Sequence, residues 1–189
     1  IRNSVKATVD AYSGQVTLYQ WDDKDPVLKT WSKAFPGTVQ AKSTISAQLL
    51  EHIRYPEDMF RVQREVLSSY HVKTASAFYG GQDFWRVPRD PSTFGANASA
   101  QPPYYLTLQM PGEAKPEFAL TTPFVPRGGR ENLSAFAVVN SDAGPNYGKI
   151  TVLQLPRSTN VAGPSQVASN FEAKPEVANS LSLLRQGGS

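Results

Sequence analysis

The amino-acid sequence predicts an α+β fold with a mixed or mainly antiparallel sheet and several short helices. Apolar and polar residues alternate near the start of the chain, with the period of a strand. Between residues 25 and 79, apolar residues recur at helical spacing behind helix-start signals. After residue 103, four apolar runs separated by turn residues again indicate strands. The 189 residues, 40% of them hydrophobic, are enough for a packed core.

The chain is predicted to begin with a β-hairpin. Val5, Ala7 and Val9 alternate with polar residues, and a second run of strand character covers residues 16–21. Gly14 lies between them, where a tight turn needs a residue that accepts a positive φ.

A helix follows the hairpin. Asp25 stands at the N-cap position and Pro26 at the first helical position. The apolar stripe of this helix consists of Val27, Leu28, Trp31 and Phe35. We expect Trp31 to anchor the core. Pro36 and Gly37 end the helix.

Two more helices are predicted before residue 71. The first covers residues 46–53 and turns Ile45, Leu49, Leu50 and Ile53 inward. The second covers residues 56–70, with Glu57 and Asp58 facing the positive end of the helix dipole. Its predicted apolar side consists of Met59, Val62, Val66, Leu67 and Tyr70. Its predicted solvent-facing side consists of Glu57, Arg61 and Glu65.

The rest of the chain reads as a turn of helix followed by strands and two closing helices. Residues 76–79 add the turn, and Phe84 and Trp85 are predicted to plug the space beneath a loop. The predicted strands are 104–110, 118–124, 133–140 and 149–155, and the predicted closing helices are 165–171 and 176–184. The turn-rich residues 141–148 favour antiparallel pairing of the last two strands, and Pro175 fits the first position of the last helix.

These elements suggest a division of the chain. Residues 1–90 hold the hairpin and helices, residues 91–103 form an exposed loop rich in Pro and Ala, and residues 104–189 are β-rich with C-terminal helices. We expect the parts to form one compact domain. The missing initiator Met and the ending in Arg-Gln-Gly-Gly-Ser suggest a fragment of a longer protein.

Composition and charge argue against several classes of function. The net charge is +3, but basic residues alternate with acidic ones instead of gathering in a stripe, so we expect no nucleic-acid partner. The chain has no Cys and only His52 and His71, so we expect no metal site and no cofactor. No apolar stretch is long enough to cross a bilayer, and the first residues contain no signal-peptide core.

The acidic residues have structural explanations that we favour over catalytic ones. Asp22, Asp23 and Asp25 lack the turn glycine and ligand spacing of a calcium loop, whereas Asp25 suits a helix cap. Glu57 and Asp58 could act as acid and base, but adjacent helix residues point about 100° apart. Neither histidine is accompanied by a Gly-x-Ser-x-Gly serine elbow. We assign no catalytic residue.

The loop Arg127-Gly128-Gly129-Arg130 is the candidate ligand-binding site. Its glycines expose backbone N–H groups, and its two guanidinium groups could clamp a carboxylate or a phosphate. The alternative is a solvated turn whose arginines pair with Glu131 or with a neighbouring loop. Neither a Walker pattern nor a dinucleotide fingerprint accompanies it.

Five ordered motifs carry a resemblance to a known family. They are Tyr55-Pro56-Glu57-Asp58-Met59-Phe60-x-x-Gln63, the stretch from Phe78-Tyr79 to Trp85, Thr122-Pro123-Phe124 with Arg127 and Asn132, Asn146-Tyr147-Gly148-Lys149, and Gly163-Pro164-x-Gln166. Together they resemble the large soluble region of an uncharacterised family of multi-pass membrane proteins of the UPF type. The family is known chiefly from actinobacteria, including mycobacteria, and from some other bacteria.

The resemblance implies a place in the cell and possible partners, but no reaction. It implies a soluble domain on the extracytoplasmic side of the cell membrane, attached to a transmembrane region of the same chain upstream of Ile1. An envelope protein, lipid or glycan is a further possible partner. The family supplies no assigned reaction, cofactor or catalytic residue.

Three hypotheses of function follow. The leading one is a non-enzymatic extracytoplasmic domain that binds a protein or an envelope component for the membrane part of its own chain. The second is an envelope hydrolase or transferase acting on lipid or glycan, with Glu57, Asp58 and Arg127 as the residues to examine. The third is a support domain of a transporter. A deep pocket that gathers those three side chains would favour the enzyme, and a broad apolar patch would favour the binding domain.

Overall fold

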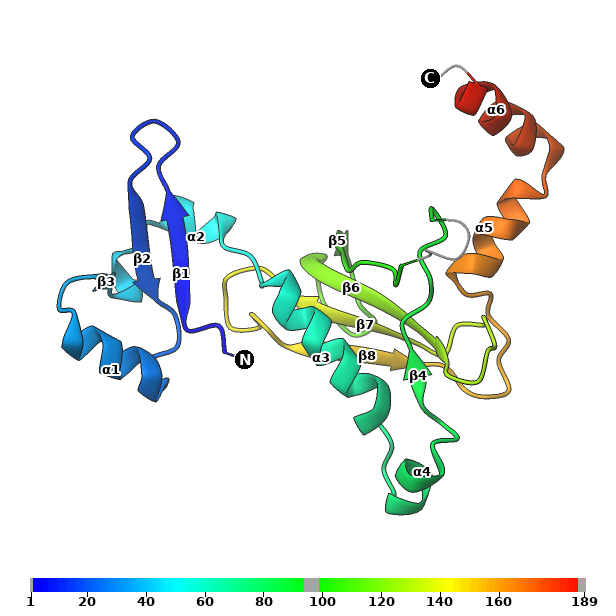
Figure 1. Ribbon diagram of the computed structural model, residues 1–189, viewed down its shortest axis with the longest axis horizontal. Helices are drawn as coiled ribbons and strands as arrows, with labels where there is room; N and C mark the ends of the chain where they lie inside the picture. The colour runs from blue at the N-terminus through cyan, green and yellow to red at the C-terminus, as the bar shows by residue number, and fades with distance from the viewer. Residues whose placement is uncertain (1, 94–98, 187–189) are drawn as a thin grey trace.

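Figure 1 shows the computed structural model, which describes residues 2–93 and 99–186. These residues form six α-helices, one short 3-10 helix and two sheets of three and five strands. All strand pairs but one are antiparallel. The predicted α+β fold is therefore confirmed.

The N-terminal lobe, residues 2–53, is built on the three-stranded sheet (Figure 1). Its first two strands form the predicted antiparallel hairpin, and Gly14 has a φ of +72° in the turn. The third strand has two residues and pairs in parallel with the second. The elements of the lobe are β1 (Val5–Val9), β2 (Val16–Gln20), α1 (Pro26–Ala34), β3 (Val39–Gln40), the 3-10 helix (Lys42–Thr44) and α2 (Ala47–His52).

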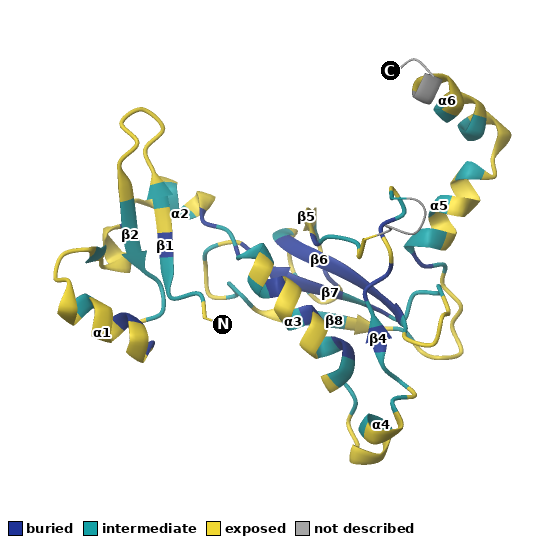
Figure 2. Cartoon of the chain, viewed as in Figure 1, coloured by how far each residue is buried: buried dark blue, intermediate teal, exposed yellow. Residues whose placement is uncertain are grey.

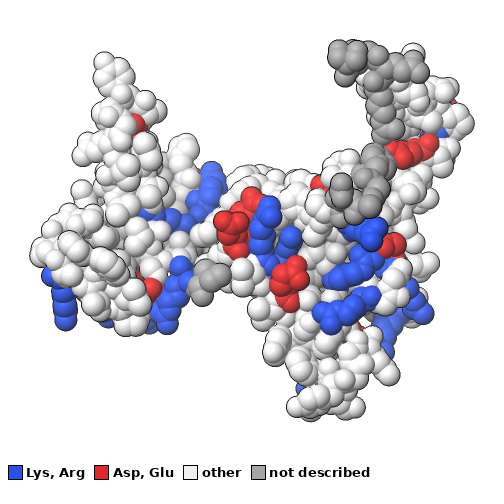
Figure 3. Space-filling view, viewed as in Figure 1, with Lys and Arg blue, Asp and Glu red and all other residues white. Residues whose placement is uncertain are grey.

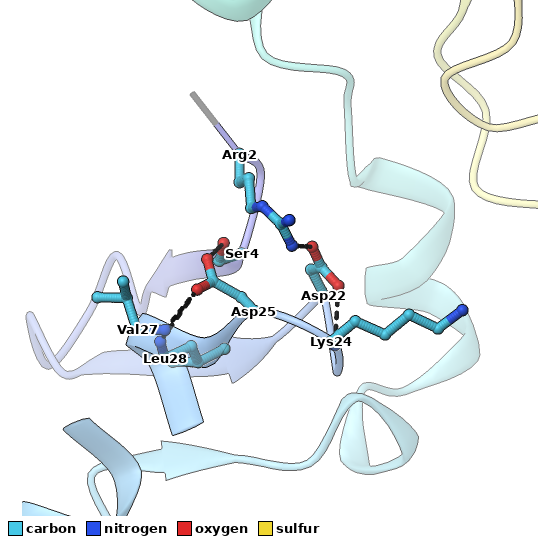
Figure 4. A network of polar contacts seen from close by, with 7 residues as sticks. All are labelled: Arg2, Ser4, Asp22, Lys24, Asp25, Val27 and Leu28. Atoms are coloured by element: carbon cyan, nitrogen blue, oxygen red, sulfur yellow. Dashed lines mark hydrogen bonds and ion pairs between the residues drawn. The ribbon is translucent and has the colours of Figure 1, made fainter. Parts of the chain in front are cut away.

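Asp25 caps α1 as predicted, and it also ties the helix to the start of the chain (Figure 4). Its Oδ1 accepts hydrogen bonds from the backbone N–H groups of Val27, at 2.7 Å, and Leu28, at 3.3 Å. Its Oδ2 accepts a hydrogen bond from the hydroxyl of Ser4. The Ser4 hydroxyl, and then the two backbone N–H groups, hold the pKa of Asp25 below its usual value.

The predicted apolar stripe of α1 is wrong for three of its four members. Leu28 is buried, but the side chains of Val27, Trp31 and Phe35 are 63%, 58% and 54% exposed. Trp31 is therefore not a core anchor. Strands of five, five and two residues offer too small a surface to cover the whole stripe.

The central sheet has the order β4-β6-β7-β8, and β5 pairs with β6 beyond the end of β4 (Figure 1). The strands are β4 (Trp85–Arg86), β5 (Tyr104–Leu108), β6 (Glu117–Pro126), β7 (Ala135–Asn140) and β8 (Ile150–Gln154). The last two are antiparallel, as the connector 141–148 predicts. β6 pairs with three neighbours, so it organises the sheet.

Helix α3 (Glu57–Tyr70) covers one face of this sheet. Phe60 is fully buried against Leu120 and Val139, while Leu67 packs against the cluster around Phe124. On the opposite face a smaller cluster contains Met110, Ala119 and Val138. The apolar core therefore lies on both sides of β6 and β7.

The predicted apolar side of α3 is partly wrong. Val62, Val66 and Tyr70 are exposed, whereas Phe60, Arg64 and Ser68 are the buried residues of the helix. Arg64 can be buried because its Nη1 donates to the carbonyl of Gln101, at 2.8 Å. A polar residue thus occupies a position that periodicity assigns to solvent. The predicted pair of Glu57 and Arg61 is present, at 2.6 Å.

The other predicted elements agree with the structure. α4 (Ala75–Gly80), α5 (Pro164–Glu172) and α6 (Pro175–Gln186) cover the expected positions, and α6 begins at Pro175. In Figure 1, α5 and α6 extend away from the sheet as an arm. The predicted loop 91–103 includes residues 94–98, which lie outside the described residues. Its flanks pair with each other through Arg89 and Ala100. The division of the chain into three parts stays a prediction.

The N-terminal lobe meets the central sheet at a seam centred on Tyr147. Its ring packs edge-on against Trp21, at 5.0 Å between centroids, and its hydroxyl accepts a hydrogen bond from Asn3. The same hydroxyl donates to the carbonyl of Arg54, at 3.2 Å. Burial raises the pKa of Tyr147 above its usual value, so the phenol stays protonated.

Lys6 is buried in this seam, and it forms no ion pair with any acidic residue that the structure describes. Its side chain is 9% exposed, and its Nζ donates to the carbonyl of Arg54, at 2.7 Å, beside the rings of Trp21 and Tyr147. Burial lowers the pKa of Lys6 from 10.5 to about 8. The charged amine therefore weakens the folded state near neutral pH.

This placement predicts how stability depends on pH. Between about pH 8 and pH 10 the unfolded chain holds the Lys6 proton and the folded chain releases it, so stability should rise with pH. Solvent at the rim of the seam screens part of the effect, and we expect a rise of about 2 kcal/mol. Above about pH 10 the raised pKa of Tyr147 reverses the trend, because the unfolded phenol ionises first.

The measurement is the free energy of unfolding in urea at about pH 7 and about pH 9.5. Lys6→Met should abolish most of the rise, and the carbonyl of Arg54 keeps Tyr147 as its donor. Lys29→Met, which changes an exposed lysine, should leave the rise intact. Equal rises in both variants would show that Lys6 is not the group responsible.

Candidate functional site

A groove of about 670 Å³ lies between the C-terminal end of α3 and the ends of β6, β7 and β8. One wall comes from residues 71–74 and 82–85, at the turn after α3 and the approach to β4. The other comes from the β6–β7 loop and from residues 154–159, which follow β8. Segments far apart in the sequence are thus brought together by the pairing of β4 with β6 and of β7 with β8.

The groove is basic. Lys73, Arg130 and Arg157 contribute positive charges, and Asp83 is the acidic residue of the lining. Asp83 is paired with Arg157, which is largely exposed. Figure 3 shows basic side chains gathered on this side of the central sheet, with few acids among them. The arrangement favours a negatively charged group over a positive one.

The structure separates the two arginines of the predicted ligand-binding loop. Gly128 and Arg130 line the groove, but Arg127 does not belong to the lining. The guanidinium group of Arg127 lies over the ring of Phe84, at 4.7 Å, and donates to the hydroxyl of Ser69, at 3.2 Å. Gly129 has a φ of +85°, which lets the loop turn between them. Whether Arg127, Gly128, Gly129 and Arg130 bind a ligand stays a prediction.

Glu131, the acid that the alternative interpretation pairs with these arginines, has a different partner. Its carboxylate forms an ion pair with Arg86 on β4. The end of the loop is also fixed by Gly163, because an added Cβ there would lie 2.0 Å from the carbonyl oxygen of Glu131. This close approach places the start of α5 against Glu131, the residue that follows Arg130 in the wall of the groove.

His71 is part of the wall of the groove, at the end of α3. Its ring stacks on Trp85 with centroids 3.4 Å apart. Nδ1 lies 2.9 Å from the carbonyl oxygen of Leu67, and Nε2 lies 3.0 Å from that of Asp83. Both ring nitrogens therefore lie within hydrogen-bond distance of backbone carbonyl oxygens at the end of α3.

The acidic residues considered in the sequence do not form a site with Arg127. Glu57 pairs with Arg61 at the first turn of α3, and Asp58 is exposed. Ser69, which contacts Arg127, lies 12 positions after Glu57, and this corresponds to about 18 Å along the helix. In the residues that the structure describes, no cluster of His, Cys, Asp and Glu could hold a metal ion.

Exposed apolar surfaces on three helical regions were not predicted from the sequence. Figure 2 shows α1 as largely exposed, and its side chains Val27, Trp31 and Phe35 form an apolar ridge on the N-terminal lobe. The rings of Trp31 and Phe35 stack at 5.3 Å. We call this surface the α1 ridge. Spacing of four residues predicts that the three side chains share a face, but it does not tell which face is buried.

Two further helical surfaces are apolar and exposed. On α3 the exposed residues are Val62, Val66 and Tyr70, spaced by four positions. On the arm they are Val167, Phe171, Leu183 and Leu184. Helices of globular proteins normally turn such residues toward a core. The described residues leave all three surfaces uncovered.

Fold and surfaces define an α+β protein with one basic groove and several uncovered apolar helix faces. The chain matches the model of the uncharacterised protein family UPF0182 over residues 1–184. The chain belongs to this family. The family predicted from the five motifs is therefore confirmed, whereas its attachment to a membrane stays a prediction.

Relatives in actinobacteria are close in sequence. A UPF0182 protein of Thermobifida fusca is 57% identical over 187 residues, which cover 98% of this chain and 18% of the relative. A UPF0182 protein of Streptomyces coelicolor is 57% identical over 190 residues, covering 100% of this chain and 19% of the relative. A UPF0182 protein of Leifsonia xyli is 52% identical over 198 residues, which cover 99% of this chain and 20% of the relative.

The chain spans about a fifth of the length of these relatives. No solved structure matches it. Among residues 2–93 and 99–186, no helix combines the length and the apolar character needed to cross a bilayer.

The groove wall yields a test at Gly163. Gly163→Ala should cost about 2 to 3 kcal/mol of stability, because the new methyl group meets backbone atoms of Glu131 that have no room to move. Gly128→Ala is the matched control: an added Cβ there meets nothing within 4 Å, and its φ is not positive. Urea unfolding measures both. Equal stabilities would contradict the close approach seen between α5 and the loop.

Proposed function

We propose that this chain is a non-enzymatic binding domain that docks onto another polypeptide through its exposed apolar helix faces. The α1 ridge is the observation that carries the proposal. Large aromatic side chains that lie exposed together are typical of protein contact surfaces, where they supply most of the binding energy.

The N-terminal lobe has a small apolar core that a partner on the α1 ridge would enlarge. Within residues 2–53, Leu28, Ile45 and Ile53 are its buried apolar side chains, and Lys6 and Asp25 are buried beside them. More large apolar groups of the lobe face solvent than are buried. Covering an exposed side chain of this size is favourable by about 1.5 to 3 kcal/mol. A partner on the α1 ridge would therefore stabilise the lobe as well as bind it.

We propose that the partner is another part of the same polypeptide. Relatives are about five times longer than this chain, so most of their sequence could supply the complementary surface. In this proposal the domain lies on the extracytoplasmic side of the cell membrane and is attached to a transmembrane region upstream of Ile1. The alternative partner for the α1 ridge is a separate envelope protein. A support role in a transporter is compatible with a partner of either kind.

The geometry gives less support to an envelope hydrolase or transferase. That hypothesis needs Glu57, Asp58 and Arg127 to converge in one pocket. Glu57 instead lies at the first turn of α3, whereas Arg127 contacts Ser69 near the other end of the helix. None of the three lines the basic groove. Enzyme activity is therefore the second candidate.

Photo-crosslinking from the α1 ridge tests the proposal. A photoreactive phenylalanine analogue replaces Trp31 in the full-length protein in its native membrane, and mass spectrometry identifies the adduct. We expect a discrete adduct with a distant part of the same polypeptide. The matched control carries the probe in place of Lys29, an exposed residue on another side of α1, and should give a weaker adduct.

The outcomes separate the alternatives. A discrete adduct with a second protein would move the proposal to an envelope partner. A lipid or glycan adduct, or equal yields from the two positions, would refute docking of a polypeptide on the α1 ridge. In the isolated chain, Trp31→Gln with Phe35→Gln should lower the free energy of unfolding by only about 1 to 2 kcal/mol, because the two rings stack on each other but are more than half exposed.

A further inference from the structure

We propose that the basic groove binds a small hydroxylated molecule that carries a phosphate or a carboxylate group. The groove is formed by the ends of strands of the central sheet and by the segment from the end of α3 to β4, whereas the α1 ridge belongs to the N-terminal lobe. This inference is therefore independent of the proposed function, and either can fail alone.

The first argument is that two cations of the groove are not used by the fold. In the described part of the chain, neither Lys73 nor Arg130 forms an ion pair or a side-chain hydrogen bond. Other arginines near the groove are engaged: Arg86 by Glu131, and Arg157 by Asp83. Lys73 and Arg130 both line the groove, one from each wall, so an anionic group bound in it would meet positive charge that no acidic side chain neutralises in the described residues.

The second argument concerns the neutral part of the lining. Gln82, Asn132, Ser134, Gln154 and Thr159 all line the groove. None of their side chains forms a hydrogen bond with another described residue. Amides and hydroxyls offer both donors and acceptors, which is what the hydroxyl groups of a sugar or polyol require. The lining thus matches a hydroxylated ligand better than an apolar one.

The backbone beneath these side chains is well fixed. The N–H of Ser134 donates to the carbonyl of Phe124, at 2.8 Å, and the N–H of Leu155 donates to the carbonyl of Ser134, at 2.9 Å. Asn132 pairs with Ala162, and the N–H of Leu133 donates to the carbonyl of Val161. Polar groups held on a rigid backbone lose little freedom when a ligand binds.

The size and the aromatic content of the groove narrow the class of ligand. Its volume of about 670 Å³ is within the usual range for small-molecule sites, roughly 300 to 1,000 Å³. Trp85 is 5% exposed and stacks on His71, and the ring of Phe84 lies under the guanidinium group of Arg127. Both aromatic rings are thus already in contact with other side chains, and the polar lining suits a phosphorylated or carboxylated sugar.

Titration of the isolated chain with defined probes tests the inference. The probes are glucose 6-phosphate and glucuronic acid, with glucose and inorganic phosphate as comparisons, and binding is followed by amide chemical shifts in nuclear magnetic resonance spectra. We expect at least one of the two charged sugars to bind more tightly than either comparison. Binding should weaken with added salt, because the cations lie near the surface. Preference for the phosphate or the carboxylate distinguishes the two sources of charge.

Matched variants locate the site. Lys73→Gln with Arg130→Gln should weaken binding of the charged sugar roughly tenfold or more. Asn132→Ala with Gln154→Ala should weaken the sugar but not inorganic phosphate. Arg127→Gln, on the same loop but outside the lining, should leave binding unchanged.

Three results would overturn the proposal. They are absence of binding by both charged sugars, equal binding of inorganic phosphate and the charged sugars, and an equal loss in Arg127→Gln and in the double variant of Lys73 and Arg130. The last result would instead place the ligand between the two arginines of the loop. Circular dichroism spectra equal to those of the parent chain establish that each variant is folded.

Discussion

The pairing of β6 with three other strands is the constraint on which the rest of the structure depends. Residues 119–125 of this strand are buried, and they connect β4 and β5 on one side to β7 on the other. Its two buried threonines are satisfied locally: Thr121 donates to the carbonyl of Tyr104, and Thr122 accepts from Arg64. The loop that carries Arg130 follows directly after β6, so the position of the basic groove depends on this strand.

The motifs that identify the family meet in pairs in the folded chain. Tyr55 and Tyr147 pack together at the seam, with ring centroids 5.5 Å apart, and a Cβ added at Gly148 would lie 3.1 Å from the ring of Tyr55. Gly163 similarly lies against the loop after β6. Tyr55, which follows the N-terminal lobe, thus packs on Tyr147, and Tyr147 in turn contacts Trp21 of the lobe. Three of the five motifs therefore contain residues that make tertiary contacts in this chain.

Local signals predicted most of the secondary structure, and long-range packing explains where prediction failed. Asp25 before Pro26, and Gly14 between alternating runs, depend only on neighbouring residues, so the sequence was sufficient for them. Which face of a helix is buried depends on the surface that it meets. Arg64 is buried with its guanidinium group donating to the carbonyl of Gln101, 37 positions away in the sequence, and Trp31 is 58% exposed and stacks on Phe35. The candidate loop was located correctly as a turn after a strand, but the groove needs Lys73 and Gln154, which no local pattern connects to Arg130.

Apolar and polar surfaces are separated along the molecule, and this separation bears on what each can do. The α1 ridge gains free energy only when water is removed from it, so a large partner must cover it. The basic groove keeps its charged groups solvated until an anion replaces the water, so a small ligand can enter without burying the surrounding surface. The seam at Tyr147 lies between the two. Docking and ligand binding can therefore be changed by separate substitutions, since they share no side chain.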